Sequence, residues 1–133
     1  MHRAVFKGNV DCVIVLIAAG AALDIQSQVG TPLDLVLDTW DRPRITPHLL
    51  RAGCTATERK LRVIENMLQS SIYNKEPNES YKYFLRVSSL GGFKQYEKAH
   101  RGRLVAAFAP KFASLPEEVV ASIMEFYAHL GFY

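Results

Sequence analysis

The hydrophobic positions at the start of the chain follow the period of an α-helix. Between Val10 and Ile17 apolar residues recur at helical spacing. Glycine commonly ends helices, so we expect this helix to end at Gly20. A second apolar run starts at Leu33, directly after Gly30-Thr31-Pro32, which supply a turn, a helix cap and a first helical residue. The pattern therefore predicts a helix, an extended hairpin and another helix.

This order returns at a fixed distance along the chain. Ala18-Ala19-Gly20-Ala21 has its counterpart in Arg51-Ala52-Gly53-Cys54, and Leu16-Ile17 returns at the same distance as Leu49-Leu50. Met1–Ala4 align with Leu33–Val36, but at a separation one residue shorter than that between Gly20 and Gly53. The second copy therefore has one extra residue between its helices. A period of about 33 residues with a Thr-Pro-Leu helix start is typical of one class of helical repeat.

On these positions, residues 1–54 resemble ankyrin repeats. The match departs from the family at Asp34, where the family usually has His, and at residues 39–44, which replace a short turn between helices. The matching positions are His2, Ala4, Gly8-Asn9, Val13, Leu16-Ile17, Gly20-Ala21 and Gly30-Thr31-Pro32-Leu33.

The resemblance implies an all-α fold, an ankyrin-type helical repeat stack of about one and a half repeats that is closed by C-terminal helices. We expect residues 1–54 to form the degenerate repeats and residues 55–133 to form a helical region that packs on them. The sequence opens inside a repeat, so either the natural chain is longer upstream, or a partner or the C-terminal part of this chain is expected to cover Met1, Ala4, Val5 and Phe6.

Residues 55–73 have the pattern of an amphipathic helix that lies where a third repeat would lie. Thr55 and Glu58 form a capping box. The apolar stripe that follows consists of Leu61, Ile64, Met67, Leu68 and Ile72. Residues 74–80 are polar and include a proline, so we expect a loop.

Three further helices are predicted after this loop. A short one covers residues 81–87 and ends at Gly91-Gly92. The next covers residues 93–112, is broken at Pro110 and is expected to bury Phe93, Tyr96, Leu104, Ala107 and Phe108. The last follows Ser114–Glu117 and is expected to bury Val119, Val120, Ile123, Phe126, Tyr127 and Leu130.

Two weaker resemblances lie in the C-terminal half. Gly91-Gly92-Phe93, the run from Tyr96 to Arg101 and the closing Gly131-Phe132-Tyr133 are similar to the tails of uncharacterised algal ankyrin-repeat proteins, which imply no activity. Leu115-Pro116-Glu117-Glu118 resembles the first helix of an F-box, a module that docks ubiquitin-ligase adaptors.

Composition fits an ordinary globular domain. Of the 133 residues, 49% are hydrophobic and 22% are charged, and no run approaches the ~18 consecutive apolar residues of a membrane-spanning helix. No signal-peptide pattern is visible, so Cys12 and Cys54 are expected to be small buried residues in a reducing compartment. We expect a cytoplasmic protein, with an organelle as the alternative although no transit peptide is visible.

The polar residues do not assemble into a catalytic or metal-binding motif. The histidines lack the spacing of a zinc motif. His2 is expected to hydrogen-bond to backbone, and the minor alternative for His100 and His129 is ligation of a pigment or metal. We therefore expect no enzyme and no cofactor.

The net charge of +3 comes from the C-terminal part. The basic residues of 93–112 are expected to form a solvated face or to meet an acidic protein partner, in preference to nucleic acid. They are Lys94, Lys98, Arg101, Arg103 and Lys111.

The sequence as a whole favours a non-enzymatic module that binds a protein partner, with no small-molecule substrate. Ankyrin proteins generally use hairpin tips and inner helices for this purpose, and Trp and Arg dominate binding hot spots. The predicted partner-binding residues are Leu23, Gln26, Ser27, Gln28, Trp40, Arg42 and Arg44. Two alternatives stay open. One is a structural or linker subunit fixed in a larger complex, for which an organellar, photosynthetic complex is conceivable, and the other is an F-box-like ubiquitin-ligase adaptor.

Overall fold

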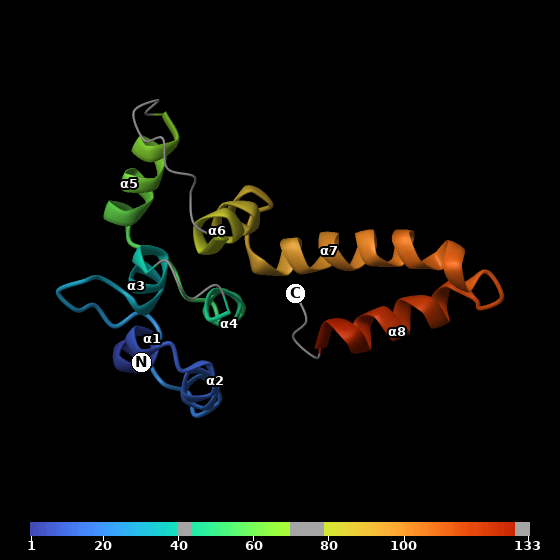
Figure 1. The fold of residues 1–133 in the computed structure, drawn as a ribbon, viewed down its shortest axis with the longest axis horizontal. Helices are drawn as coiled ribbons and strands as arrows, with labels where there is room; N and C mark the ends of the chain where they lie inside the picture. Colours follow the sequence, from blue (N-terminus) through green and yellow to red (C-terminus); the bar gives the residue numbers. More distant parts are fainter. Residues whose placement is uncertain (40–43, 70–78, 130–133) are drawn as a thin grey trace. The chain divides into compact units, whose positions relative to one another are not determined.

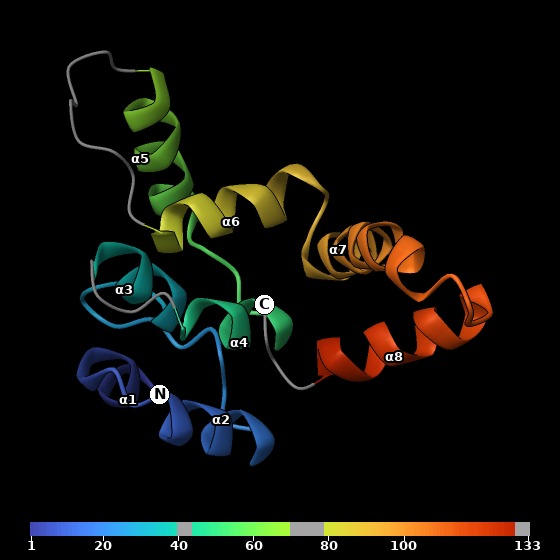
Figure 2. The same ribbon diagram turned by 45° about the vertical axis from the view of Figure 1, so that its right-hand side comes forward.

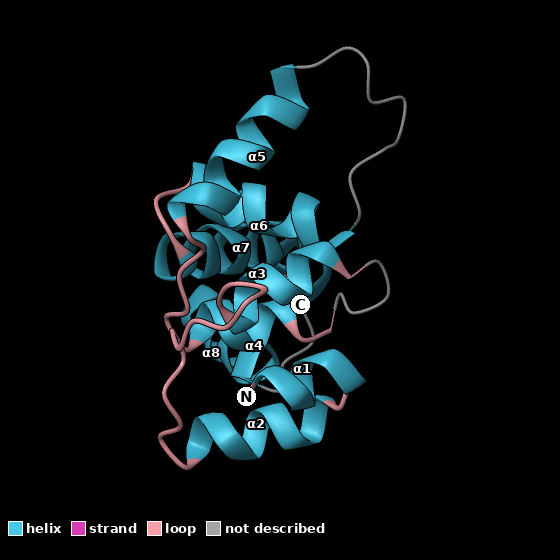
Figure 3. Ribbon diagram, turned by 90° about the vertical axis from the view of Figure 1, so that its left-hand side faces the viewer, coloured by secondary structure: helices cyan, strands magenta, loops and turns pink. Residues whose placement is uncertain are grey.

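The computed structural model describes residues 1–39, 44–69 and 79–129 (Figure 1). Within these ranges the chain is mostly helical and has no strand, which confirms the predicted all-α class (Figure 3). The elements are α1 (His2–Lys7), α2 (Val10–Ala18), α3 (Pro32–Asp38), α4 (Thr46–Arg51), α5 (Glu58–Gln69), α6 (Glu79–Ser89), α7 (Phe93–Phe108), the 3₁₀ turn η1 (Ala109–Phe112) and α8 (Glu117–His129).

The chain forms two compact units, Met1–Arg86 and Val87–Tyr133. In the first unit α1 pairs with α2, α3 pairs with α4, and α1 packs against α3. Within this unit, α3 and α4 lie between α1 and α2 on one side and α5 and α6 on the other (Figures 1 and 2). In the second unit α7 packs against α8. The predicted boundary at residue 54 and the predicted stacking of complete repeats stay predictions.

The end of α2 at Gly20 and the start of α3 at Pro32 follow the predicted signals. Asn9 caps α2 because its side chain accepts a hydrogen bond from the amide of Cys12 at 3.0 Å. After α2, Gly20 has a φ of 72°, and the amide of Ala21 donates to the carbonyl of Leu16 at 2.9 Å. Pro32 is the first residue of α3, as predicted.

The start of α5 differs from the prediction. Thr57, and not Thr55, caps this helix, because its Oγ1 accepts a hydrogen bond from the amide of Lys60 at 3.2 Å. Thr55 instead donates to Asp24, so it belongs to a contact between segments rather than to the helix. Ile64 is buried as predicted, whereas Leu61 is 39% exposed. The other members of the predicted stripe lie outside the described side chains.

The predicted C-terminal helices are present with altered ends and faces. Glu79 and Ser80, predicted as loop, begin α6. Pro110 lies in η1, which ends the long helix α7 as predicted. Ala107 of α7 is exposed, contrary to the prediction, whereas Tyr96 is buried.

The buried face of α8 was predicted incorrectly at two positions. Val119 and Ile123 are each 41% exposed, whereas Val120 is buried as predicted. Met124, which was not predicted to be buried, is also buried. Phe126, Tyr127 and Leu130, also predicted to be buried, lie outside the described side chains.

Candidate protein-interaction surface

The hairpin between α2 and α3 has a tight tip closed by hydrogen bonds. The amide of Ser27 donates to the carbonyl of Gly30 at 3.0 Å, and the amide of Gly30 donates back at 3.1 Å. The hydroxyl of Ser27 donates to the same Gly30 carbonyl at 3.1 Å and accepts from the amide of Val29 at 3.3 Å. Ser27 therefore fixes the turn that presents Gln28 and Val29.

Contacts on both arms of the hairpin attach it to the rest of the first unit. The Nε2–H of His2 on α1 donates to the carbonyl of Gly30 at 2.9 Å, which confirms the predicted backbone bond of this histidine. On the opposite side, Asp24 accepts hydrogen bonds from the amide of Thr55 at 3.1 Å and from its hydroxyl at 3.4 Å. The hairpin is thus held at Asp24 and at Gly30, which limits the conformational entropy it loses on binding.

The tip of the hairpin exposes more apolar surface than the sequence indicated. Gln26, Ser27 and Gln28 are exposed, as a binding role requires, and Leu23 is half-buried. Ile25 and Val29 are 56% and 55% exposed, and neither was among the predicted site residues. An anchored loop with two exposed apolar side chains and two exposed amides has the composition of a protein-binding surface.

The remaining predicted site residues come from the segment between α3 and α4. Arg44 is exposed. Trp40 and Arg42 lie outside the described residues. The structure therefore brings together the four hairpin residues of the predicted site, and their relation to Trp40 and Arg42 stays a prediction.

A buried carboxylate lies behind the hairpin. Asp34 is 3% exposed, and its Oδ2 accepts a hydrogen bond from the amide of Thr31 at 3.0 Å while Thr31 Oγ1 accepts from the amide of Asp34 at 3.2 Å. This capping box fixes the start of α3. The second oxygen, Oδ1, accepts from the amide of Thr57 at 3.1 Å and so ties α3 to the start of α5.

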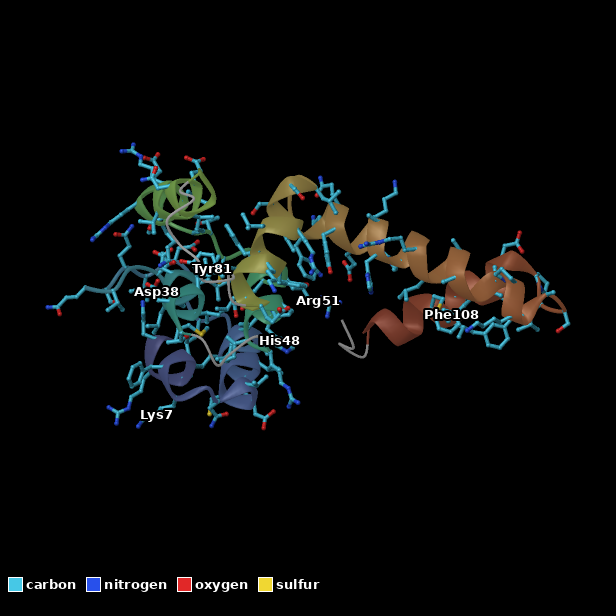
Figure 4. All side chains as sticks on the ribbon, turned by 45° about the horizontal axis from the view of Figure 1, so that its top comes forward. Lys7, Asp38, His48, Arg51, Tyr81 and Phe108 are labelled. Atoms are coloured by element: carbon cyan, nitrogen blue, oxygen red, sulfur yellow. The ribbon has the colours of Figure 1, made fainter. Side chains whose placement is uncertain are left out.

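A buried cation joins three helices of the same unit. Lys60 on α5 is 8% exposed and forms an ion pair with Asp38 on α3. Its ammonium group also lies 5.9 Å from the ring centroid of Tyr81 on α6, and Figure 4 labels Asp38 and Tyr81 on their helices. Burial raises the pKa of the Tyr81 phenol although the Lys60 charge opposes this shift. The cluster therefore connects α3, α5 and α6 through one buried ammonium group.

The two cysteines differ in exposure, and both are free thiols. Cys54 is buried as predicted, and its thiol donates to the carbonyl of Leu23 at 3.9 Å. Burial, helped by the charge of Asp24, raises the pKa of Cys54 to about 11. Cys12 is exposed, contrary to the prediction of a buried residue.

Iodoacetamide at pH 8 is expected to modify Cys12 and to spare Cys54. With a pKa of about 11, about one in a thousand Cys54 thiols is ionised at this pH, and only the thiolate reacts. Mass spectrometry of dilute native protein should show one label per chain, and two in denaturant. Labelling of Cys54 in the native protein at the rate of Cys12 would contradict the buried position.

Among the described residues, no group of three or more His, Cys, Asp or Glu side chains is arranged to hold a metal ion. The ring of His100 stacks on that of Tyr96 with centroids 5.9 Å apart, and burial, together with Arg103, lowers the pKa of His100. Tyr96 is itself 6% exposed, so it offers no face on which a nucleobase could stack. None of the described helices has the length and hydrophobicity needed to cross a membrane.

No family model and no solved structure matches the chain. Among curated proteins, the chain is similar to the Inhibitor of Bruton tyrosine kinase of Xenopus laevis, with 42% identity over 59 residues. The similar segment spans 44% of this chain and 4% of the length of that relative. That relative contains ankyrin repeats and is a regulatory protein rather than an enzyme, so the similarity and the helical fold are both consistent with an ankyrin-like protein.

Sequence reasoning missed the buried Asp34 and Lys60 as well as the exposed Ile25 and Val29. One signal was present for Asp34, since Thr31 and Asp34 have the spacing of a capping box with an acidic third residue. Nothing local marks Lys60, because its partner Asp38 is 22 residues away.

Proposed function

We propose that this chain is a non-enzymatic interaction module that binds a partner protein through the exposed tip of its anchored hairpin. The proposal rests on one observation, the exposure of Ile25 and Val29 on a loop whose ends are held by α1 and by Thr55. The predicted residues Gln26, Ser27 and Gln28 lie between these two apolar residues in the chain and are also exposed. The similarity to an ankyrin-repeat protein supports a role in protein interaction.

Val29→Glu is expected to lower the affinity for the partner about tenfold or more, because a carboxylate buried in an apolar interface loses its hydration. The measurement is affinity capture with the immobilised chain, followed by titration of the purified partner. Val63→Glu is the matched control, since Val63 is 39% exposed on α5 and makes the same change of charge away from the hairpin. A partner that binds both variants equally would contradict the proposal.

The relative's name suggests a first candidate partner for that titration, a Bruton-type tyrosine kinase. The same capture separates the two alternatives. Recovery of a stoichiometric multi-protein assembly would favour the fixed subunit, and recovery of a ubiquitin-ligase adaptor would favour the F-box-like role. The cytoplasm is the compartment that we propose, and an organelle remains the alternative.

A further inference from the structure

The first arm of the hairpin, residues 24–26, carries main-chain groups that are open to solvent. These residues form no helix, turn or bend, and all three are exposed. Among the described residues, no donor or acceptor bonds to the main-chain amide or carbonyl of Asp24, Ile25 or Gln26. The bonds of Asp24 to Thr55 are made by its side chain. The arm lies on a hairpin that extends away from the helices of the first unit (Figure 1).

The bonds at the tip fix the direction in which these main-chain groups point. Ser27 and Gly30 exchange amide and carbonyl hydrogen bonds, so the main-chain groups of Ser27 face the second arm, Gly30 and Thr31. In an extended chain, the main-chain groups of successive residues point alternately to opposite sides. Those of Gln26, and of Asp24 two residues earlier, therefore point away from the second arm. We call this row of two amides and two carbonyls the open edge.

The second arm differs because its outward main-chain groups are already bonded. The amide of Thr31 donates to Asp34 Oδ2 at 3.0 Å, and the carbonyl of Thr31 accepts from the amide of Leu35 at 3.1 Å. The next residue, Pro32, has no amide and begins α3. The open edge is therefore the side of the hairpin on which another chain can form main-chain hydrogen bonds.

The first arm lacks the residues by which proteins usually prevent such pairing. Exposed strand edges are commonly blocked by proline, lysine or a bulge. Residues 21–29 contain neither proline nor lysine, and Asp24 is their only charged residue. Ile25 and Val29 are exposed, and both are β-branched residues of the kind that strands favour. The composition of the arm therefore suits it to pair with another extended chain.

We propose that the open edge binds an extended peptide segment of the partner protein, which pairs with the first arm as a β-strand. This inference rests on the proposed function and specifies the chemistry of the partner. The amides and carbonyls of the peptide bond to those of Asp24 and Gln26, and an apolar side chain of the peptide lies beside Ile25. Because Asp24 and Gly30 are already anchored, the edge is ordered before the peptide arrives.

A library of random peptides displayed on phage, selected on the intact chain, supplies a defined probe. The selected peptide is synthesised, and isothermal titration calorimetry with the intact chain measures its dissociation constant. The expected value lies between about 10 µM and about 1 mM, because a short edge forms few hydrogen bonds. A library that yields no peptide in this range or tighter would overturn the proposal.

Gln26→Pro tests the role of the main chain, because proline removes one outward amide of the open edge. The Gln26 amide bonds to no described residue, so the free protein loses no hydrogen bond. Gln26→Ala removes the same side chain and keeps the amide. The dissociation constant of the peptide is expected to be at least about tenfold higher for Gln26→Pro than for Gln26→Ala. Circular dichroism establishes that both variants are folded, and equal constants would overturn the proposal.

Hydrogen exchange measured by NMR provides a second test without substitution. The bound peptide is expected to slow exchange at the amides of Asp24 and Gln26, which lie on the open edge. The amide of Ile25 points to the opposite side and serves as the internal control. Equal slowing at all three amides, or no slowing at Asp24 and Gln26, would contradict strand pairing.

The partner protein itself distinguishes failure of this inference from failure of the proposed function. If Val29→Glu weakens binding of the partner while Gln26→Pro and Gln26→Ala weaken it equally, the hairpin binds through side chains and strand pairing is wrong. If Val29→Glu leaves binding of the partner unchanged, the proposed function is wrong. A loss of binding in Val29→Glu together with a larger loss in Gln26→Pro than in Gln26→Ala supports both.

Discussion

Asp34→Ala is expected to lower the free energy of unfolding of the first unit by about 3 kcal/mol. The carboxylate of Asp34 is 3% exposed and accepts hydrogen bonds from the amides of Thr31 and Thr57. Hydrogen bonds to a charged group contribute about 1.5–3 kcal/mol each, and both amides would lose their acceptor. The loss is large because one side chain both caps α3 and holds α5 against it.

Urea denaturation followed by circular dichroism measures this loss. Asp34→Asn keeps one carbonyl oxygen and is expected to cost about half as much, since one of the two amides keeps an acceptor. Asp11→Ala removes an exposed carboxylate from α2 and should change stability by less than about 0.5 kcal/mol. Equal stability of the Asp34→Ala variant and the wild type would contradict the bridging role of this carboxylate.

Gly30→Ala is expected to cost about 3 kcal/mol for two separable reasons. Gly30 has a φ of 92°, a conformation in which a side chain costs about 1 kcal/mol or more. A Cβ at this position would also lie 3.0 Å from the Cβ of Asp34 and within contact of Oδ2. Asp34 is held by two hydrogen bonds, so it cannot move without losing them.

Gly53→Ala is the matched control for backbone strain. Gly53 has a φ of 93°, and a Cβ there would meet nothing within 4 Å. The difference in unfolding free energy between the two variants isolates the clash with Asp34. In a double-mutant cycle, Gly30→Ala should cost less in the Asp34→Ala background, because the obstructing carboxylate is absent. Equal costs for Gly30→Ala and Gly53→Ala would show that the contact with Asp34 is unimportant.

Local signals in the sequence were sufficient to predict the hairpin turn and the start of α3. Gly30, Thr31 and Pro32 each have a backbone role that depends on near neighbours, and the structure has them in those roles. The cap of α5 was less well determined, because Thr55 and Thr57 both precede a helix-forming run. Thr55 was selected for its spacing to Glu58, but its hydroxyl and amide bond to Asp24, 31 residues away.

Which face of a helix is buried depends on the helices that pack against it, and a local sequence pattern does not contain this information. On α8, Val119 and Ile123 are as apolar as Val120 and Met124, so hydrophobicity alone does not indicate which of these side chains are buried. In the structure Val120 and Met124 are buried. Lysine is rarely buried without a partner, so nothing in the local sequence marks Lys60 as a buried residue. Its partner Asp38 lies on α3, and the ion pair forms because α5 is placed beside α3 in the fold.

The attachment of the hairpin and of α5 has a consequence for the order in which the first unit folds. Each of these links joins residues separated by 22 to 31 positions, about one repeat length. Short separations lower the entropy lost in closing each contact and are associated with fast folding. During synthesis, each helix pair can therefore form its hydrogen bonds with the segment synthesised just before it. The first unit can then fold one helix pair at a time as the chain leaves the ribosome. The separations are those of His2–Gly30, Asp24–Thr55, Asp34–Thr57 and Asp38–Lys60.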